Sequence, residues 1–340
     1  MAIVTVCVPV YNAEAFVAET LDSVVKQTLS DLRILISLDK STDDSEGVCR
    51  RYLEDPRVEL IVQPDRLGWV GNVNALITRV DTPYFCIVPH DDRLHPRYLS
   101  EVLALADSDP AIACAYSDIE GFGANRQRFE QPEIRGERLE RVLDVLLNHY
   151  CAVAFRGVVR RFGPGDRPFV PTGLRGDVAA DAAWMVQLAL RGELRRVPAT
   201  LYAKRYAADS VHAAWFRYSR LERIALWAEQ AAACTRIALE HVVDPVDRNI
   251  VLAAALMRVA GVGDAANRSS TPRGATAVAA ANEIFKRALG DIPLPDDTNG
   301  LLSHPHARLL RQAVAKMASR SSPRQLPGKI RRRLTWFLGR

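Results

Sequence analysis

Short apolar runs alternate with helical stretches through the first 120 residues, and this alternation is the feature that most constrains the fold. Five apolar runs, the first of them β-branched, lie at 3–8, 33–38, 58–62, 84–88 and 112–116. Apolar residues at helical spacing lie between them, at 13–27, 43–53, 70–79 and 96–106. Strands and helices that alternate in this way are joined by right-handed crossovers. The pattern predicts an α/β domain with a mainly parallel sheet that helices cover on both faces.

Polar residues follow four of these runs, at the edge where the carboxyl ends of parallel strands meet. Ligands of such open sheets bind just beyond that edge. Neither G-x-G-x-x-G nor G-x-x-x-x-G-K-[ST] follows the first run, so a dinucleotide fingerprint and a P-loop are not predicted. The segments of interest are "PVYN" (9–12), "DKSTDDS" (39–45), "QPDRLGWVGNVN" (63–74) and "HDD" (90–92).

The chain is less regular after residue 120. Gly and Pro cluster in "GPGDRPFVPTG" (163–173), which predicts an exposed or mobile loop. Residues 181–192 have a helical pattern, 197–206 a strand pattern, and Ala-rich helical sequence fills 215–260. We therefore expect a sheet domain over 1–214, a C-terminal helical extension over 215–289, and a linker with a basic tail over 290–340.

Positive charge is concentrated at the carboxyl end. The 340 residues include 45 Lys or Arg and 40 Asp or Glu, a net charge of +5. Residues 303–340 hold ten of the basic residues and no acid, so the remainder, with 35 basic and 40 acidic residues, carries −5. No basic face interleaved with aromatics precedes this tail, which argues against a nucleic-acid partner. The end of the tail, "LPGKIRRRLTWFLGR" (326–340), either lies on an anionic bilayer or is a solvated basic tail.

The sequence favours a cytoplasmic protein, with peripheral contact at the inner face of the cell membrane if the tail binds lipid. Residues 1–12 lack a basic n-region and a cleavage site, so a signal peptide is not predicted. No apolar run approaches the roughly 20 residues that span a bilayer. The six cysteines lie far apart without a C-x-x-C pair, which is typical of reduced, buried thiols.

Four segments, in order, resemble the family 2 glycosyltransferases, which bind nucleotide sugars with a GT-A fold. "VTVCVPVYNAEAFVAETLDSVVKQTLSDLRILISLDKSTDDS" (4–45) is similar to the opening of that domain. "RLGWVGNVNAL" (66–76) is similar to its Asn-x-Gly…Arg-Asn segment, and "PHDDRLHPRYL" (89–99) takes the place of its D-x-D motif. "DAAWMVQLALRG" (181–192) looks like the helix that carries its catalytic base. Four ordered matches make the resemblance specific, although each one alone would be weak.

The resemblance implies a GT-A-type, Rossmann-like sheet and a sugar transfer. The donor would be a nucleotide-diphosphate sugar, UDP-linked in our expectation, and transfer would invert the anomeric centre. The acceptor would be a hydroxyl of a glycan or of a lipid-linked molecule, in polysaccharide or cell-envelope glycan biosynthesis.

The resemblance also implies nucleotide contacts. Asp39 can accept the N3–H of a uracil, because an ionised carboxylate is only an acceptor; its alternative role is to cap the next helix. Pro9 and Tyr11 would border the base, where the Tyr11 ring offers a stacking face, or they form a tight turn. The remaining expected contacts are Arg66, Asn74, Asp92 and Arg205, the last as a neutraliser of the diphosphate or as an ordinary surface charge.

The adjacent acids Asp91 and Asp92 repel each other, so a cation beside them would explain their presence. By resemblance, Asp91 is the last acid of D-x-D and would hold Mg²⁺ or Mn²⁺ against the leaving diphosphate. His212 could complete the metal shell. Pro89 stands at the first position of the motif, and the H-D-D form looks like a variant of bacterial members. The alternative is that the two acids cap the helix that begins near residue 96.

Asp181 is the expected catalytic base, since inverting transfer needs a carboxylate that takes the proton of the acceptor hydroxyl. Asp177 is the rival base, and the alternative role for Asp181 is a helix acid that interacts with the dipole. The family usually has Glu where this chain has Ala180. Leu38, Pro89 and Ala180 each replace a frequent family acid, so a second hypothesis is a catalytically impaired partner protein that binds nucleotide sugars.

Overall fold

The structure, a computed structural model, describes residues 2–148, 153–206, 217–259, 275–294, 301 and 305–312. The chain forms two compact units. The sheet unit comprises Met1–Arg135, Cys151–Gly173 and Ala180–Ala213, and the helical unit comprises Gly136–Tyr150, Leu174–Ala179 and Ala214–Arg340. The helical unit therefore includes 136–150 and 174–179, which the sequence did not separate from the sheet domain.

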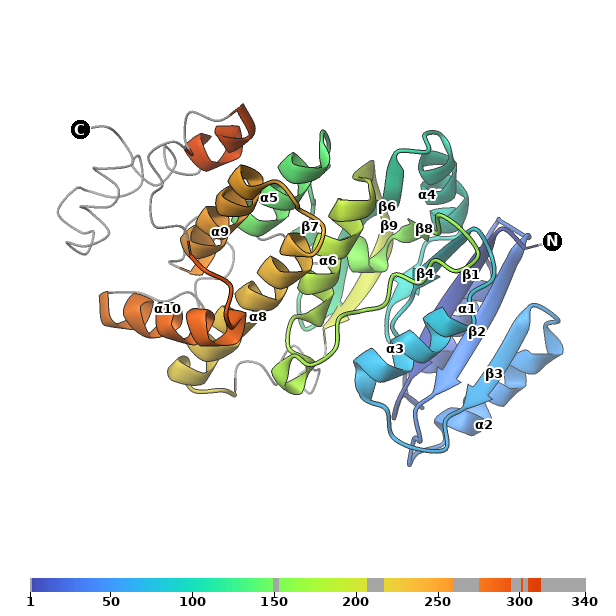
Figure 1. The fold of residues 1–340 in the computed structure, drawn as a ribbon. Coiled ribbons are helices and arrows are strands. Elements are labelled where there is room, and N and C mark those ends of the chain that lie inside the picture. The colour runs from blue at the N-terminus through green and yellow to red at the C-terminus, as the bar shows by residue number, and fades with distance from the viewer. Residues whose placement is uncertain are drawn as a thin grey trace. The chain divides into compact units, whose positions relative to one another are not determined.

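A nine-stranded sheet organises the sheet unit (Figure 1). Its strands are β1 (Val4–Val10), β2 (Leu32–Leu38), β3 (Val58–Val62), β4 (Tyr84–Ile87), β5 (Arg93–Leu94), β6 (Ile112–Gly123), β7 (Arg128–Phe129), β8 (Val158–Arg160) and β9 (Glu193–Tyr206). Their order is β3-β2-β1-β4-β8-β6-β9-β5, and β7 pairs with β6. Strands β1 to β4 are mutually parallel, as are β6 and β9, whereas β8 runs antiparallel between β4 and β6. The predicted mainly parallel sheet is confirmed.

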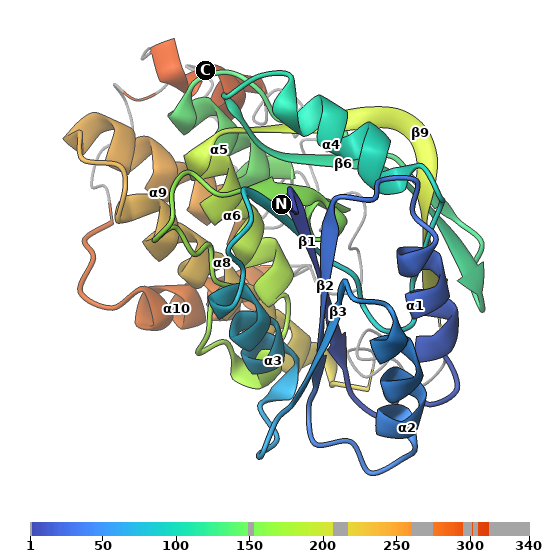
Figure 2. The same ribbon diagram turned by 90° about the vertical axis from the view of Figure 1, so that its right-hand side faces the viewer.

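Helices cover both faces of this sheet, as the alternation predicts (Figure 2). One face carries α1 (Val17–Val25), α2 (Ser45–Arg50) with the short η1 (Arg51–Glu54), and α4 (Tyr98–Asp107); the other carries α3 (Gly68–Thr78) and α6 (Ala180–Arg191). Gln27, just after α1, joins α1 to α4. Its amide donates to the carbonyl of His95 (2.8 Å) and accepts from the N–H of Leu99 (2.9 Å).

An aromatic cluster fills the space between the sheet and α6. Trp184 of α6 is fully buried, and its ring centroid lies 6.4 Å from that of Phe85 and 5.6 Å from that of Phe155. Phe155 belongs to the short η2 (Val153–Arg156) and also lies edge-on to Trp69 of α3, at 5.9 Å. Each such aromatic pair adds about 0.5–1.5 kcal/mol beyond burial alone. The cluster therefore fixes the first turns of α6, which carry Asp181, against β4.

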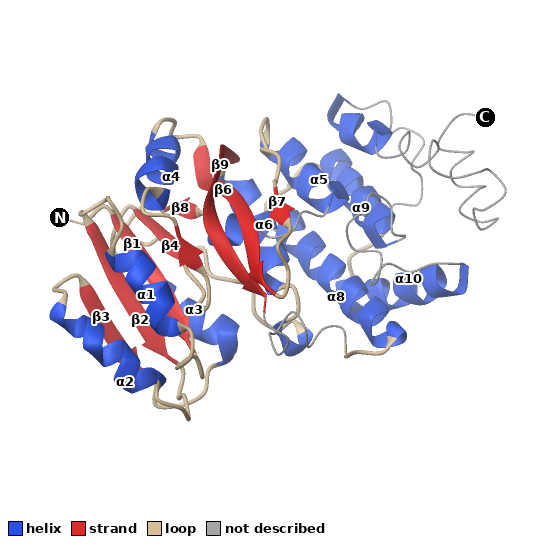
Figure 3. Cartoon of the chain, turned by 180° about the vertical axis from the view of Figure 1, so that it is seen from behind, coloured by secondary structure: helices blue, strands red, loops and turns tan. Residues whose placement is uncertain are grey.

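The described part of the helical unit consists of helices (Figure 3). They are α5 (Arg138–Asn148), η3 (Arg175–Asp177), α8 (Arg220–Leu239), α9 (Pro245–Val259), α10 (Ala275–Leu289) and η5 (Pro305–Ala307). A capping box of Ser219 and Glu222 begins α8, which packs against α9 and α10. Helices α8 to α10 lie in the region predicted as a helical extension. The basic tail from residue 313 onward lies outside the described residues.

The described cysteines are buried, free thiols at Cys7, Cys49, Cys86, Cys114 and Cys234. Burial raises the pKa of the Cys86 thiol to about 12, so this group is protonated at neutral pH. Within the part of the chain that the structure describes, no helix is both long enough and apolar enough to cross a bilayer.

Candidate active site

The carboxyl ends of β2, β1 and β4 lie side by side at one edge of the sheet (Figure 1). Val10 at the end of β1 is in register with Leu38 of β2, and Cys7 of β1 with Ile87 of β4. Because the three strands are parallel neighbours, the residues that follow them emerge together. The ring Nδ1 of His90, after β4, lies 3.1 Å from the carbonyl oxygen of Pro9 in β1. The edge therefore brings together the segments that the sequence singled out.

Arg66 occupies the space between Tyr11 and Asp39. Its guanidinium carbon lies 3.5 Å from the centroid of the Tyr11 ring, and its Nη1 forms an ion pair with Oδ2 of Asp39. The other oxygen of Asp39 accepts a hydrogen bond from the N–H of Leu67 (2.6 Å). Asp39 has no exposed surface, whereas the Arg66 side chain is 41% exposed. The Arg66 guanidinium thus covers both the buried carboxylate of Asp39 and one face of the Tyr11 ring.

The alternative capping role of Asp39 does not occur in this structure. Helix α2 begins at Ser45 after Asp44, without a side-chain cap. The residues between β2 and α2 instead bind the turn after β1. The Asn12 side-chain oxygen accepts from the N–H of Thr42 (2.9 Å), and the Asn12 N–H donates to the Ser41 hydroxyl (3.0 Å). Asn12 takes a left-handed conformation, φ 44°, which Asn tolerates better than most residues.

Asp92 is bound on both oxygens by the protein itself. Its Oδ2 accepts from Nε of Arg156 (2.8 Å) and from the hydroxyl of Tyr202 (2.9 Å), and its Oδ1 accepts from the backbone N–H of Arg205 (2.9 Å). Its side chain is 1% exposed. Asp92 therefore joins β9 and η2 to the turn after β4. It does not cap α4, which begins at Tyr98 without a side-chain cap.

Asp91 differs from its neighbour. No other residue in the described ranges hydrogen-bonds its carboxylate, and burial, then the charge of Asp92, raise its pKa. Asp91 is half-buried, and an acid that lacks an ion-pair partner among the described residues is suited to a cation. Since Asp92 is consumed by protein contacts, the residues present fit a metal site with one carboxylate, and no cluster of three potential ligands occurs among the described residues. His212 lies outside the described residues.

Arg205 is held by its own set of partners. Its guanidinium carbon lies 4.7 Å from the Phe16 ring and 4.4 Å from the Phe122 ring, and Nη2 pairs with Glu19. Its Nε donates to the backbone carbonyl of Asp91 (3.2 Å). Glu19 also pairs with Nη1 of Arg93, so two guanidinium groups share one carboxylate, and the contacts of Arg205 fix the backbone that carries Asp91.

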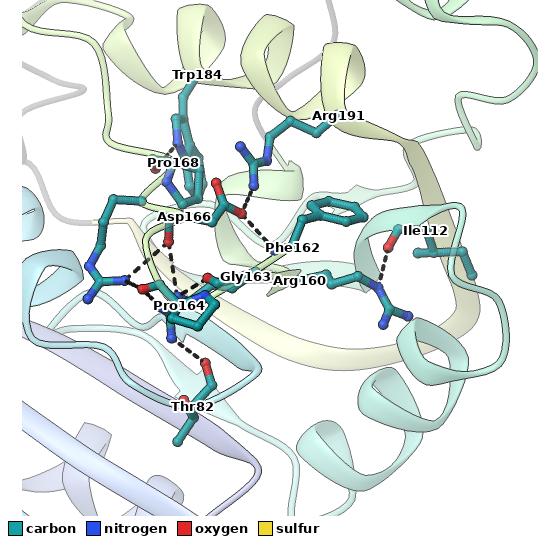
Figure 4. A network of polar contacts seen from close by, with 12 residues as sticks. Thr82, Ile112, Arg160, Phe162, Gly163, Pro164, Asp166, Pro168, Trp184 and Arg191 are labelled. Carbon is teal, nitrogen blue, oxygen red and sulfur yellow. Dashed lines mark hydrogen bonds and ion pairs between the residues drawn. The ribbon is translucent and has the colours of Figure 1, made fainter.

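Pro164, Gly165, Phe169, Thr172 and Gly173 are exposed, as the Gly and Pro residues of 163–173 predicted, and side chains around the loop bind its backbone (Figure 4). Arg161 is buried and donates to the backbone carbonyl of Thr82 (2.9 Å), just before β4, and within the loop to that of Asp166 (3.0 Å). The Asp166 carboxylate pairs with Arg191 at the end of α6. The indole N–H of Trp184 donates to the Pro168 carbonyl (2.7 Å). These contacts hold the loop against α6.

The same loop continues to α3 through Asn74. The side-chain amide of Asn74 donates to the carbonyl of Val170 (2.9 Å), and its oxygen accepts from the N–H of Val170 (2.8 Å). This two-bond contact uses both polar ends of the amide. In this structure Asn74 fastens the loop to α3.

Asp181 lies in the first turn of α6 and is half-buried. One of its oxygens accepts from the N–H of Ala182 (2.9 Å). Asp177, the rival base, ends η3 in the helical unit with φ 53°, and burial raises its pKa. Only Asp181 of the two belongs to the unit that holds the strand edge.

Arg156 is a site residue that sequence reasoning missed. It ends η2, binds Asp92, and lies within electrostatic reach of both Asp91 and Asp181. No motif covers it, because it follows an irregular segment rather than a predicted strand. The only available signal was an Arg within an otherwise apolar stretch, "AVAFRGVV" (152–159).

Comparison with known proteins assigns a family to this geometry. Residues 5–163, which include β1 to β4 and the acids after β4, match the family described as Glycosyl transferase family 2. The chain carries a family 2 glycosyltransferase domain. Curated relatives match over parts of their length: glycosyltransferase GlyA of Streptococcus pneumoniae is 28% identical over 123 residues, and chondroitin synthase of Pasteurella multocida 29% over 116 residues. These matches cover 35% and 34% of this chain, but only 18% and 12% of the relatives.

Solved structures extend the likeness of fold beyond this domain to nearly the whole chain. S. aureus TarS 1–349 matches 93% of this chain and 88% of its own, with a TM-score of 0.62 and 16% identity. Its complex with UDP-GlcNAc matches with a TM-score of 0.63 and 17% identity over the same shares. At this identity the likeness concerns the fold. The expected GT-A-type α/β class is confirmed.

Proposed function

We propose that the chain transfers a sugar from a uridine diphosphate sugar to a hydroxyl of a glycan or lipid-linked acceptor, with inversion. One observation carries the proposal: an aromatic ring and a buried acceptor, Tyr11 and Asp39, share a strand edge with Asp91, a half-buried acid that has no ion-pair partner among the described residues. Tyr11 and Asp39 fit a nucleobase, and Asp91 fits a cation-bound diphosphate. The glycosyltransferase names of the relatives and the UDP-GlcNAc complex of TarS support this reading.

The pattern at Asp39 favours uracil over guanine. One carboxylate oxygen is held by the N–H of Leu67, so a single oxygen remains for the base once Arg66 withdraws. Uracil offers one N3–H between two carbonyls, whereas guanine offers two adjacent N–H groups that need both oxygens. Pro9 and Tyr11 would border the base, with the Tyr11 ring as the stacking face.

Asp91 would hold Mg²⁺ or Mn²⁺. Magnesium is commonly bound through one or two carboxylates, with substrate phosphates and water as the other ligands. When bound, such an ion acts as a Lewis acid that stabilises the charge of the diphosphate leaving group. His212 is the second proposed ligand. Arg205 would keep Asp91 in place through its contact with the Asp91 carbonyl.

Asp181 would act as the base. It would take the proton of the acceptor hydroxyl while the hydroxyl oxygen bonds to the anomeric carbon and the bond from that carbon to the diphosphate oxygen breaks on the opposite side. One oxygen of Asp181 accepts from the Ala182 N–H, and within the described residues the other has no hydrogen-bond partner. The first turn of α6 can thus hold the carboxylate while leaving it an acceptor for the hydroxyl.

The test is a panel of nucleotide sugars given to the purified full chain, with Mn²⁺ and with a chelator. We expect nucleotide release from UDP sugars in the presence of Mn²⁺, faster with an acceptor glycan, and little from GDP-mannose. Calorimetry with UDP runs beside it. A chain that neither binds UDP nor releases nucleotide from any donor contradicts the proposal.

A second candidate function is a nucleotide-sugar-binding partner without turnover. Leu38, Pro89 and Ala180 stand where the family often has acids, and Asp92 is fully engaged by the protein. Tight UDP binding without release from any donor, with any acceptor extract, would favour it.

The setting that fits the proposed acceptor is polysaccharide or cell-envelope glycan synthesis in the cytoplasm, at the inner face of the membrane. The basic tail 326–340 would supply the peripheral contact. Co-sedimentation of the full chain with vesicles of anionic and of neutral lipid, before and after removal of 326–340, tests this. Equal binding to both kinds of vesicle contradicts it.

A further inference from the structure

Arg156 is held firmly at the candidate site. Its backbone carbonyl accepts a hydrogen bond from the Tyr98 hydroxyl, and its Nε donates to Asp92 (2.8 Å). The next residue, Gly157, lies so close to β6 that a Cβ there would meet the Cys114 sulfur at 2.5 Å and the Ala115 carbonyl oxygen at 2.6 Å. The backbone at Arg156 therefore has little freedom to move.

The guanidinium keeps unused donors. Only Nε has a hydrogen-bond partner among the described residues, so the four N–H bonds of Nη1 and Nη2 remain available. The side chain is 15% exposed. Because a nearly buried guanidinium with open donors is costly in a folded protein, these donors are expected to meet a ligand or water.

Arg156 is connected through its neighbours to both the proposed metal-binding acid, Asp91, and the proposed base, Asp181. Asp92, which it binds, is adjacent to Asp91 in the chain. Phe155, beside it, packs against Trp184, one helical turn after Asp181. Burial lowers the pKa of Arg156, but the nearby acids, first Asp92 and also Asp181, more than offset this and raise it. The guanidinium is a permanent cation that interacts electrostatically with both the proposed metal acid and the proposed base.

We propose that Arg156 donates hydrogen bonds from Nη1 and Nη2 to the β-phosphate of the nucleoside diphosphate, an inference that rests on the function proposed above. As the bond between the anomeric carbon and the β-phosphate oxygen breaks, its electron pair stays on that oxygen. Arg156 neutralises this charge without giving up a proton, since guanidinium stays protonated. Hydrogen bonds from fixed donors to developing charge are an effective form of catalysis.

A β-phosphate contact from Arg156 would compensate for a metal site that has one open carboxylate. Pro89 removes one acid from the family's motif and both oxygens of Asp92 are bound by the protein, so Asp91 is the one acid of the motif that is open to the cation. Even with His212 as second proposed ligand, the site holds one acid fewer than the family's motif, and a fixed guanidinium supplies a second positive group against the diphosphate. The competing explanation is that Arg156 only neutralises buried Asp92.

The two explanations differ in what they predict for UDP and UMP, because UMP lacks the β-phosphate. We would measure both affinities by calorimetry with Mn²⁺, for wild type, Arg156→Gln and Arg156→Lys. A β-phosphate contact predicts about 10- to 100-fold weaker UDP binding in Arg156→Gln, with UMP little changed and Arg156→Lys between the two. In transfer assays, kcat should fall more than KM rises. Arg97→Gln, which removes an exposed cation paired with Glu101, is the matched control and should leave both affinities unchanged.

The double variant Asp92→Asn with Arg156→Gln separates the explanations further, because it removes the buried acid together with its partner. If Arg156 only neutralises Asp92, the double variant should regain UDP affinity, and this outcome would overturn our inference. Equal loss of UDP and UMP affinity in Arg156→Gln would overturn it as well. Wild-type protein that binds neither nucleotide would instead contradict the proposed function, so the two failures are distinguishable.

Discussion

The guanidinium carbon of Arg66 lies 3.5 Å from the centre of the Tyr11 ring, on a face that a nucleobase would need for stacking. The same guanidinium pairs with the one Asp39 oxygen that is not held by Leu67. Arg66 thus stands where the base is proposed to bind, and contacts the same two groups. A cation–π contact at an exposed site contributes about 0.5–1 kcal/mol, and a bound nucleotide would have to replace both this contact and the ion pair with Asp39.

Replacing Arg66 with Ala should strengthen UDP binding by about 3- to 10-fold, because the competing cation is gone. The variant should also unfold at a lower temperature without ligand, since Asp39 is left buried without its counter-charge. Calorimetry and thermal unfolding with and without UDP measure both effects. Lys40→Ala, which removes a neighbouring cation paired with exposed Asp65, is the control. Weaker UDP binding in Arg66→Ala would show that Arg66 contacts the bound nucleotide instead.

Replacing Asp39 with Asn should reduce discrimination between UDP and CDP. The carboxylate accepts from uracil N3–H, whereas cytosine presents an acceptor at N3 and repels it. An amide can rotate to offer either group, so the preference for UDP should shrink by about tenfold or more. The ratio of the two dissociation constants is the readout. An unchanged ratio would remove Asp39 from base recognition.

Replacing Asp181 with Asn should lower kcat by about 10²- to 10⁴-fold, because the proton acceptor is lost. UDP affinity should stay the same, since Asp181 does not contact the nucleotide in our proposal. Asp177→Asn removes an acid of similar size four residues earlier and serves as the comparison. If Asp177→Asn is the more damaging change while both variants bind UDP normally, the base is Asp177.

Asp118 should contribute stability that depends on pH. It is 1% exposed and accepts from Nε of Arg196 (2.6 Å) and Nη2 of Arg128 (2.8 Å). Burial raises the pKa of Asp118, but its hydrogen bonds with the two arginines outweigh burial and leave the pKa below the ordinary 3.8. A depressed pKa gives stability that is present above the unfolded-state pKa and is lost as pH falls through the folded-state value.

Asp118→Asn should therefore reduce the free energy of unfolding by about 1–3 kcal/mol at pH 7. The difference from wild type should shrink below about pH 4, where the wild-type carboxylate also loses its charge. Urea unfolding across this pH range measures it. Glu120→Gln, an exposed acid on the same strand, should show little effect at any pH. A deficit that persists undiminished at low pH would point to packing rather than charge.

Asn74→Ala should lower stability without changing nucleotide affinity. The variant loses the two hydrogen bonds to Val170, each of which contributes about 0.5–1.5 kcal/mol. Unfolding in urea and UDP calorimetry on the same sample separate the two roles. A selective loss of UDP binding with normal stability would restore Asn74 to the nucleotide site.

The sequence predicted the central sheet well, because parallel strands buried on both faces are continuous apolar runs with helices between them. Strand β8 escaped prediction. It has three residues and pairs antiparallel between β4 and β6, so neither length nor alternation marks it. Residues 136–150 were read as part of an irregular stretch, yet they contain α5 and belong to the helical unit.

The division of roles between Asp91 and Asp92 could not be read from their adjacency. Asp92 is bound by Arg156, Tyr202 and Arg205, which lie 64, 110 and 113 residues away along the chain. The residues next to Asp92 in the sequence do not indicate these distant partners. The same holds for Asn74, which a motif suggested as a nucleotide contact and whose partner Val170 lies 96 residues away. Motifs locate the edge of the sheet, but tertiary contacts decide which of its polar groups stay open.

The contacts of Asp92 also affect how loss-of-activity screens of this chain should be interpreted. Alanine at either aspartate would abolish turnover, and both would then be scored as essential. At Asp91 the lesion would be a missing ligand in an intact fold. At Asp92 it would be the release of β9 and η2 from the turn after β4, visible as a lowered melting temperature. Two neighbouring positions with the same phenotype would thus report one chemical defect and one architectural defect.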